Sequence, residues 1–256
     1  MTRRRWIADE FSRDRAALTG AHAAHLSRTL RARIGQEFEV ACGDRVRRAA
    51  IASITDDRVE FALSEEVAAS DGAPIALLLA IFKFDRMEWA IEKCTELNVT
   101  TIVPVIARRT EKHLAIAAEK RVERWRRIAR EASEQSRRTS PPEITDPFKL
   151  GELLKAPVSV DTPNSDANAD TVRVVLVETE RGVSLTEVLR SHQHVASLAL
   201  ATGPEGGWAE DELQSFASSQ WIAASLGETI LRAETAAVAA LAIARAEIQL
   251  FVQATS

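Results

Sequence analysis

Residues 197–208 read Ser-Leu-Ala-Leu-Ala-Thr-Gly-Pro-Glu-Gly-Gly-Trp, an apolar run that passes directly into a glycine-rich turn. The run from Ser197 to Ala201 predicts a strand that is buried on both faces. Glycine admits positive φ and lets a ligand approach the main chain closely. Open parallel sheets bind ligands at the carboxyl ends of their strands. The turn is therefore a candidate binding loop, with a tight structural turn as the alternative.

The segments around this turn alternate between strands and helices, which predicts an α/β domain with a largely parallel sheet. Pro141 and Pro142 stop a long helix, and residues 156–170 have the composition of an exposed loop. The predicted strands are Ile75–Phe82, Thr101–Ile106, Val172–Val177, Ser197–Ala201 and Trp221–Ser225, and the predicted helices are Arg86–Glu96, Ala115–Arg138, Ala209–Ser218 and a closing helix within 231–252.

The first 70 residues differ, because short alternating segments there predict a β-rich module with one helix. The helix is expected over Ala21–Arg33, with Gly35 just past its end. Strands are expected at Phe38–Cys42, Ala49–Ile54 and Val59–Leu63. Residues 69–74 are the best candidate linker between this module and the α/β domain.

A second candidate loop, Leu226–Thr235, lies between the last strand and the closing helix. Its Ile230 and Leu231 are apolar residues that could wall an adenine pocket, and Arg232 could stabilise negative charge on a substrate. An ion pair at the helix entry, with Thr235 as a cap, is the alternative. In the first loop, Glu205 is either a base or a group that holds the turn together.

Composition excludes several classes of protein. The 256 residues are 46% hydrophobic and 27% charged, typical of a folded globular protein. The longest aliphatic run is too short to span a bilayer, and no signal peptide is visible. The two cysteines form no metal-spaced pair, so we expect reduced thiols and no metal site. No phosphate-binding loop of the GxxxxGK[ST] type is present, which argues against a nucleotide hydrolase.

The net charge of −4 hides a segregation of charge along the chain. Lysine and arginine exceed the acidic residues over 1–50 and over 104–138, whereas acidic residues dominate 141–256. Two basic regions on an acidic chain indicate contact with a polyanion, with solvated surface charge as the alternative.

The two loops together resemble the signature of the RsmE family of bacterial 16S rRNA uridine-N3 methyltransferases. The matching residues are Gly203-Pro204-Glu205-Gly206-Gly207 and Leu226-Gly227-x-x-Ile230-Leu231-Arg232-x-Glu234-Thr235-Ala236. Lys83-x-x-Arg86-Met87-Glu88, the helix around Trp125–Arg138 and His25-Leu26-x-Arg28 resemble further family segments. Asn98 stands where the family commonly has glycine, but asparagine tolerates left-handed φ, so the turn can survive.

The resemblance implies a PUA-like RNA-binding β-barrel over residues 1–72 and a SPOUT-type methyltransferase domain over 73–256, with a C-terminal trefoil knot. It implies S-adenosylmethionine as the methyl donor and a uridine N3 of 16S rRNA, within the small ribosomal subunit, as the acceptor. It further implies a homodimer in the cytoplasm, with no metal and no membrane. The alternatives are a SPOUT enzyme acting on tRNA or on a ribose 2′-OH, and a non-catalytic RNA-binding assembly factor.

The resemblance also assigns residues to three roles. The candidate catalytic residues are Arg232 and Arg5, first and second in line to stabilise the charge of the deprotonated uridine, and Glu205, a candidate base. The expected cofactor-binding residues are Val177, Thr202, Gly203, Pro204, Glu205, Gly206, Gly207, Leu226, Gly227, Ile230, Leu231 and Thr235. The expected RNA-binding residues are Arg3, Arg4, Arg5, Arg28, Arg31, Arg33, Lys83, Arg109 and Arg138.

Overall fold

The computed structural model describes residues 5–67, 72–155, 171–192 and 195–254, with side chains up to Ile248. The chain forms two compact units. The first comprises residues 1–71 and 130–141, and the second comprises residues 72–129 and 142–256. Residues 69–71 of the linker expected at 69–74 and the whole loop expected at 156–170 lie outside the described residues.

The first unit is built on a curled six-stranded sheet. Its strand order is β1-β4-β5-β6-β3-β2, and all neighbours are antiparallel except the parallel pair β1 and β4. Register shifts between β5 and β6 mark bulges, which bend a sheet and increase its twist. The strands are β1 (Arg5–Ile7), β2 (Glu10–Phe11), β3 (Arg15–Thr19), β4 (Glu37–Cys42), β5 (Arg45–Ile54) and β6 (Arg58–Val67).

The core of this unit forms on the concave side of the sheet around Trp6, Leu26 and Phe61, which are nearly inaccessible to solvent. The strands predicted near Phe38, Ala49 and Val59 are confirmed, but β1, β2 and β3 were not predicted. Two of these three strands have only two or three residues. Such strands are too short to show a repeating pattern.

The helix predicted over Ala21–Arg33 is shorter in the structure. It consists of α1 (Gly20–Ala24) and one π-helical segment, His25–Thr29. Arg31 has a φ of 51°, which a right-handed helix cannot accommodate. The helix therefore ends before Arg31 and does not continue to Arg33.

The second unit is built on a parallel sheet, as the sequence predicts. Its main strand order is β10-β8-β7-β12-β11-β13, and β9 also pairs with β8. All of these pairs are parallel. The strands are β7 (Ile75–Ala80), β8 (Thr101–Ile106), β9 (Glu143–Ile144), β10 (Phe148–Lys149), β11 (Thr171–Leu176), β12 (Ser197–Thr202) and β13 (Ile222–Ala224).

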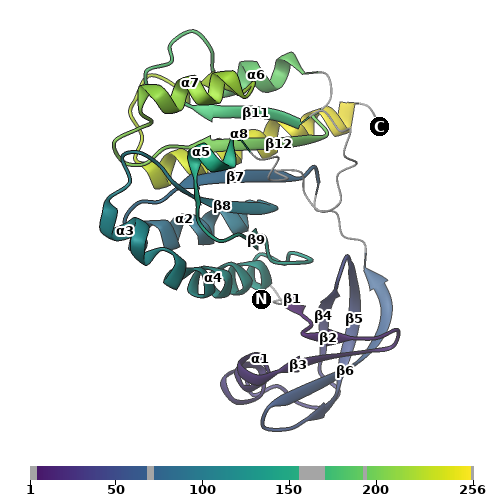
Figure 1. Cartoon of the computed structure of the whole chain (residues 1–256). Helices are drawn as coiled ribbons and strands as arrows, with labels where there is room; N and C mark the ends of the chain where they lie inside the picture. Colours follow the sequence, from purple (N-terminus) through teal and green to yellow (C-terminus); the bar gives the residue numbers. More distant parts are fainter. Residues whose placement is uncertain (1–4, 68–71, 156–170, 193–194, 255–256) are drawn as a thin grey trace. The chain divides into compact units, whose positions relative to one another are not determined.

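Helices cover both faces of this sheet (Figure 1). Because alternate strand residues point to opposite faces, Leu77 joins one hydrophobic core and Leu78 the other. One face packs against α2 (Phe84–Glu96), α4 (Val122–Gln135), α6 (Leu185–Ser191) and α8 (Ala233–Ala254). The other face packs against α5 (Leu150–Leu153) and α7 (Glu210–Ser218).

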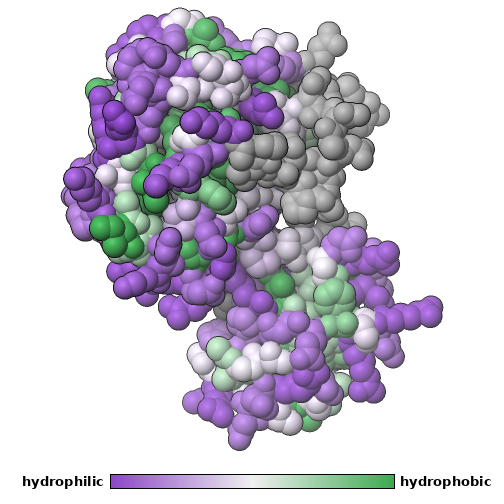
Figure 2. Space-filling model, in the orientation of Figure 1, coloured by the Kyte–Doolittle hydropathy of each residue, from purple (hydrophilic) through white to green (hydrophobic). Residues whose placement is uncertain are grey.

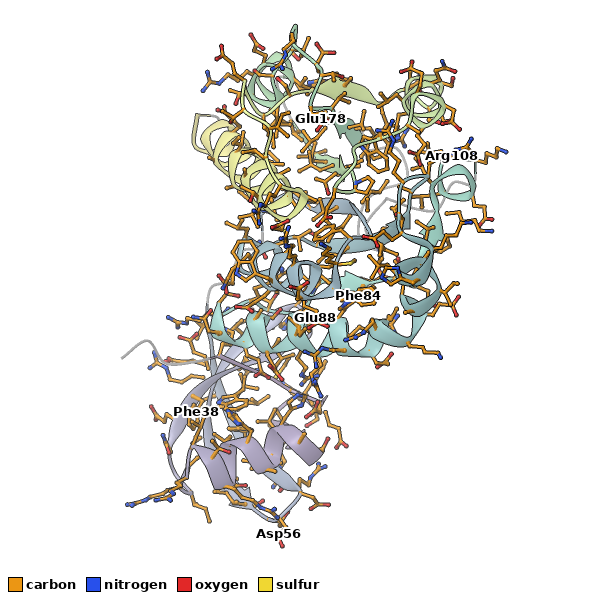
Figure 3. All side chains as sticks on the ribbon, turned by 90° about the vertical axis from the view of Figure 1, so that its left-hand side faces the viewer. Phe38, Asp56, Phe84, Glu88, Arg108 and Glu178 are labelled. Carbon is orange, nitrogen blue, oxygen red and sulfur yellow. The ribbon has the colours of Figure 1, made fainter. Side chains whose placement is uncertain are left out.

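Helices α2 and α4 are joined by an aromatic and ionic cluster. Phe84 packs against Trp125 with ring centroids 6.0 Å apart, and the Arg121 guanidinium lies 4.9 Å from the Phe84 ring centroid. Glu88, one helical turn after Phe84, accepts a hydrogen bond of 2.7 Å from Arg124 (Figure 3). The cluster fixes the first turn of α2, which leads out of the loop after β7.

The single long helix predicted over Ala115–Arg138 is wrong. The segment contains α3 (Lys112–Ala117), a 3₁₀ turn (Glu119–Arg121) and α4. The Arg121 N–H donates to the Ala118 carbonyl three residues back, which tightens the chain there. Arg137 has a φ of 62° and follows the end of α4, so the helix stops before Pro141.

Asn98 adopts a φ of 64°, as expected for a residue that replaces glycine after α2. Its carbonyl, like those of Leu97 and Ala73, accepts a hydrogen bond from the guanidinium of Arg245 on α8. One buried arginine thereby ties the closing helix to the turn before β8 and to the start of β7. Buried carbonyls are costly without such partners.

Hydrophilic side chains predominate on the visible face of the molecule, where hydrophobic ones form small separate patches (Figure 2). Among the helices that the structure describes, none combines the length and the hydropathy of a membrane span. Cys42 and Cys94 are buried free thiols, and burial raises the pKa of Cys94 to about 12.

Candidate functional site

A cavity of about 610 Å³ opens in the second unit at the carboxyl ends of three neighbouring strands. Its walls come from the segments after β11, β12 and β13, which are adjacent in the sheet order β12-β11-β13. The two candidate loops, which residues 209–225 separate in the sequence, therefore meet at one site because their strands flank β11. The volume is within the range of small-molecule sites, roughly 300–1,000 Å³.

The glycines of the first loop permit close packing. A Cβ at Gly203 would lie 3.2 Å from Nε1 of Trp208, and a Cβ at Gly206 would lie 3.3 Å from Cδ of Arg109. Gly207 has a φ of 70°, which strongly favours glycine, and its N–H donates to the Pro204 carbonyl at 2.8 Å. The loop is thus a tight turn whose main chain approaches the cavity directly.

The carboxylate of Glu212 anchors the end of this loop. It accepts hydrogen bonds from the N–H of Ala209, at 2.9 Å, and from the N–H of Arg108, at 2.8 Å. The first bond caps α7, and the second holds the loop after β8 beside α7. Arg109, the next residue, donates to the Gly206 carbonyl. The loop after β8 and the glycine-rich loop therefore support one another.

Two buried polar atoms in the cavity walls lack hydrogen-bond partners among the described residues. They are Oγ1 of Thr202 and Nε1 of Trp208. A buried polar group without a partner costs about 1–3 kcal/mol, so such groups mark places where a ligand or water completes the bonding. Apolar side chains of Leu176, Leu226 and Leu231 form other parts of the wall. This combination suits a ligand with both a flat apolar part and polar groups.

Charged side chains of both signs line the cavity. Arg86 lies between two carboxylates, with Nη1 3.4 Å from Oε1 of Glu205 and 3.6 Å from Oε1 of Glu234. It therefore links the first loop to the first turn of α8. Within the described part of the chain, the side chains of Arg232 and Lys83 make no ion pair or hydrogen bond, and both line the cavity. These two cations are available to a negatively charged substrate.

Sequence reasoning missed three charged residues of the cavity wall: Arg86, Glu178 and Glu210. Arg86 belongs to a motif that was recognised, but the motif alone gave no reason to place it between Glu205 and Glu234. Glu178 follows β11, and its carboxylate lies against Gly207, 3.3 Å from where a Cβ would stand. Figure 3 labels Glu178 and Arg108 in the second unit. The spacing of charges across different strands is invisible in a single sequence.

Most residues predicted to bind the cofactor lie in this cavity wall. Two do not: Gly206, which packs against Arg109, and Thr235, which is exposed in the first turn of α8. The predicted residues that line the cavity are Val177, Thr202, Gly203, Pro204, Glu205, Gly207, Leu226, Gly227, Ile230 and Leu231, together with Arg232, Lys83 and Arg109.

The other predicted RNA-binding or catalytic residues belong to the first unit. Arg5 is buried, with Nη2 2.9 Å from Oε2 of Glu39, and it donates to the Arg137 carbonyl. Burial opposes ionisation of Glu39, but hydrogen bonds from Arg137 and Arg5 outweigh it and lower the pKa of Glu39. Arg138 is buried, whereas Arg28, Arg31 and Arg33 are exposed; Arg3 and Arg4 lie outside the described residues.

Comparison with known proteins defines the class first. Residues 70–245 match the family model described as an RNA methyltransferase domain, which covers more than half of the chain. The second unit, which carries the cavity, thus belongs to the class of RNA methyltransferase domains.

Relatives then define the particular family. The chain is 33% identical over 228 residues to ribosomal RNA small subunit methyltransferase E of Synechocystis sp., covering 88% of this chain and 71% of the relative. It is 28% identical over 236 residues to the protein of the same name from Bacillus subtilis, covering 88% and 87%. The chain belongs to the RsmE family of ribosomal RNA small subunit methyltransferases.

A solved structure agrees with this assignment. The fold matches that of a ribosomal RNA small subunit methyltransferase E from Neisseria gonorrhoeae with a TM-score of 0.78 and 26% identity, over 94% of this chain and 95% of that one. That protein was crystallised with S-adenosyl methionine bound. The match extends over both units, so it includes the curled N-terminal sheet.

Proposed function

We propose that this protein transfers a methyl group from S-adenosylmethionine to N3 of a uridine in 16S rRNA of the small ribosomal subunit. The observation that supports this most strongly is the meeting of both motif loops around one cavity, with an unpaired arginine in its wall. The apolar wall formed by Leu226 and Leu231 suits adenine, and the partnerless Thr202 hydroxyl and Trp208 indole N–H suit polar groups of the same ligand.

When bound, the cofactor supplies a methyl group already activated by the sulfonium. The chain has to position the uridine in line with that methyl group and manage its N3 proton. Loss of the N3 proton to water would leave negative charge spread over N3, O2 and O4 of the base. That charge would be used up as N3 bonds to the methyl carbon and the bond from that carbon to sulfur breaks. Arg232 lines the cavity and its side chain has no partner among the described residues, which supports a role in stabilising that charge. Arg5, the second candidate, is buried in the first unit and bound to Glu39 and to the Arg137 carbonyl, so Arg232 is the stronger candidate.

Glu205 is less suited to act as the base than to act as an anchor. Its carboxylate is 3.4 Å from the Arg86 guanidinium, and a second carboxylate, Glu234, shares that guanidinium. The contact between Glu205 and Arg86 joins the glycine-rich loop to the first turn of α2. We therefore assign to Glu205 the task of holding the glycine-rich loop.

The proposal includes four further properties. We propose that the first unit is a PUA-like domain that binds RNA, that the C-terminal part of the chain forms a trefoil knot, and that the protein acts as a homodimer in the bacterial cytoplasm, where ribosomes assemble. Trp89 on α2, 45% exposed, and Ile230 at the cavity, 74% exposed, support a dimer because a second copy would cover large apolar side chains.

The experiment that tests the function is methylation of 16S rRNA in vitro. The protein is incubated with S-adenosylmethionine and one of two substrates: small ribosomal subunits from a strain that lacks this activity, or an unmodified 16S rRNA transcript. The nucleosides of the product RNA are then identified by mass spectrometry. We expect 3-methyluridine. Methylation of a ribose 2′-OH, methylation of tRNA only, or binding without any transfer would each overturn the proposal in favour of a different RNA methyltransferase or a non-catalytic factor.

A further inference from the structure

The exposed arginines of the first unit fall into two groups. Several are already neutralised by acidic partners within 4.0 Å: Arg28 by Asp56, Arg45 by Glu66, Arg48 by Glu65 and Arg58 by Glu10 and Glu60. By contrast, the side chains of Arg31 and Arg33, like those of Arg13 and Arg15, make no ion pair or hydrogen bond with any described residue. A cation that is not paired internally is free to pair with a polyanion.

Arg31 and Arg33 lie in a short segment, residues 30–34, whose backbone is fixed. The N–H of Leu30 donates to the His25 carbonyl and the N–H of Ala32 to the Leu26 carbonyl, both at 3.1 Å. Just beyond the segment, the N–H of Gly35 donates to the Ile51 carbonyl at 2.8 Å. Segment 30–34 is therefore held at both ends and does not have to be ordered when a partner binds.

Within the segment, Arg31 has a φ of 51°, a conformation that side chains other than glycine, asparagine and aspartate rarely adopt. Backbone in sparsely populated regions occurs preferentially at binding sites. Ala32 packs against the core of the unit, so the side chains on either side of it point outward. The left-handed conformation of Arg31 thus helps to expose Leu30 and Arg31 on one side of Ala32. Arg33 and Ile34 are exposed on the other side.

Two of the outward side chains are large and apolar. Leu30 is 50% exposed and Ile34 is 68% exposed. They flank the two unpaired arginines, so the segment interleaves apolar and cationic side chains. None of these four side chains belongs to the described hydrophobic core of the unit.

We propose that segment 30–34 is an RNA-contacting element in which Arg31 and Arg33 bind phosphates and Leu30 and Ile34 pack against an unpaired base. The inference rests on the proposed function, because that function supplies the polyanionic partner. Unpaired bases in RNA offer a flat apolar face next to a phosphate chain, which matches cations interleaved with apolar groups. A protein partner would leave the two cations without charge complementarity unless it were acidic.

The test separates the apolar contribution from the cationic one. Binding of the full chain to a 16S rRNA transcript that the parent protein methylates is measured at several salt concentrations. For Leu30→Ser/Ile34→Ser we expect the dissociation constant to rise about tenfold at every salt concentration, since apolar contacts are insensitive to salt. For Arg31→Gln/Arg33→Gln we expect the salt dependence itself to weaken, by about 0.7 in log–log slope for each lost phosphate contact.

Ile116→Ser is the matched control, because Ile116 is 79% exposed on α3 of the second unit, and it should bind RNA like the parent. Circular dichroism and the melting temperature should be unchanged in all three variants, since every substituted side chain is exposed. The inference is overturned if Leu30→Ser/Ile34→Ser binds RNA with the parental affinity, or if only the oligomeric mass of this variant changes. Either result would leave the proposed methyltransferase function standing. A parent that neither binds nor methylates the transcript would instead refute the proposed function.

Discussion

Arg232 differs from the other arginines of the cavity in having no partner. Arg86 is shared by two carboxylates and Arg109 donates to Gly206, whereas the Arg232 side chain makes no hydrogen bond or ion pair with a described residue. The ion pair at the helix entry, which sequence alone left open, is made by Arg86 with Glu234 and not by Arg232. This leaves Arg232 free for a substrate.

We predict that Arg232→Ala lowers the rate of the methyl-transfer step about 100- to 1,000-fold while the affinity for S-adenosylmethionine stays within about twofold of the parent. The reason is that the arginine acts on the charge of the deprotonated uridine and not on the cofactor. Single-turnover methylation of 16S rRNA at saturating cofactor measures the first quantity and calorimetry the second. Equal losses in transfer and in cofactor affinity would show that Arg232 holds the cofactor instead.

Arg86 should act through the loops that it joins. We predict that Arg86→Met weakens cofactor binding about three- to tenfold, a modest effect because the three side chains are partly exposed. Arg86→Lys should recover part of this loss, since lysine can still pair with one carboxylate. Calorimetric titration with S-adenosylmethionine checks both variants, and an affinity unchanged in Arg86→Met would rule out this linking role.

At the scale of elements, the site depends on strands whose ends are brought together by burial. β7 is inaccessible to solvent along its whole length and contributes to both hydrophobic cores. We predict that Leu77→Ala lowers the free energy of unfolding by about 2–5 kcal/mol, because it leaves a cavity in a close-packed core. Ile222→Ala, at a strand position that is 38% exposed, should cost clearly less in the same urea titration. Equal costs would mean that the core packing differs from this description.

The sheet of the first unit has an ionic contribution at β1 and β4. Arg5 and Arg137 both bind Glu39, and the pKa of Glu39 is lowered from its ordinary value of 4.5. A lowered pKa means that the pair stabilises the fold above about pH 4.5 and that this stabilisation is lost as the pH falls through the native pKa. Glu39→Gln should therefore melt at a lower temperature than the parent at pH 7.

The same comparison repeated at acidic pH tests whether the charge of Glu39 is responsible for the stabilisation. The difference in melting temperature between the parent and Glu39→Gln should shrink as the pH is lowered below 4.5, because Glu39 then becomes protonated in the parent as well. A difference that stays constant down to pH 3 would indicate that the substitution acts through packing and not through charge.

Elements long enough to show a pattern could be predicted from the sequence, and short ones could not. β8 spans Thr101–Ile106 as expected, and β12 differs by one residue. The two-residue strands β2, β9 and β10 escaped prediction because they carry no period. The break between α3 and α4 also escaped, because the apolar spacing continues through the buried Ala118 and Val122 while the backbone tightens.

For the molecule as a whole, the two motif loops predicted which residues share one cavity better than they predicted how the charged side chains around it pair. Val177, Gly203 and Leu231 line one cavity, although they follow three different strands. The roles of Glu178 and of Arg86 between two carboxylates depend on distances across the sheet, which a single sequence does not contain. Which arginines form ion pairs also cannot be predicted from a single sequence, because pairing depends on which strands are neighbours.

The most direct test of the account is a calorimetric titration of the full chain with S-adenosylmethionine. Leu231→Asp places a charge in the apolar wall, and Ile116→Asp, at an exposed position outside the cavity, is its control. We predict that the parent and Ile116→Asp bind S-adenosylmethionine saturably and with equal affinity. Leu231→Asp should bind it about tenfold more weakly or worse. Absence of saturable binding to the parent, or parental affinity in Leu231→Asp, would contradict the assignment of this cavity as the cofactor site.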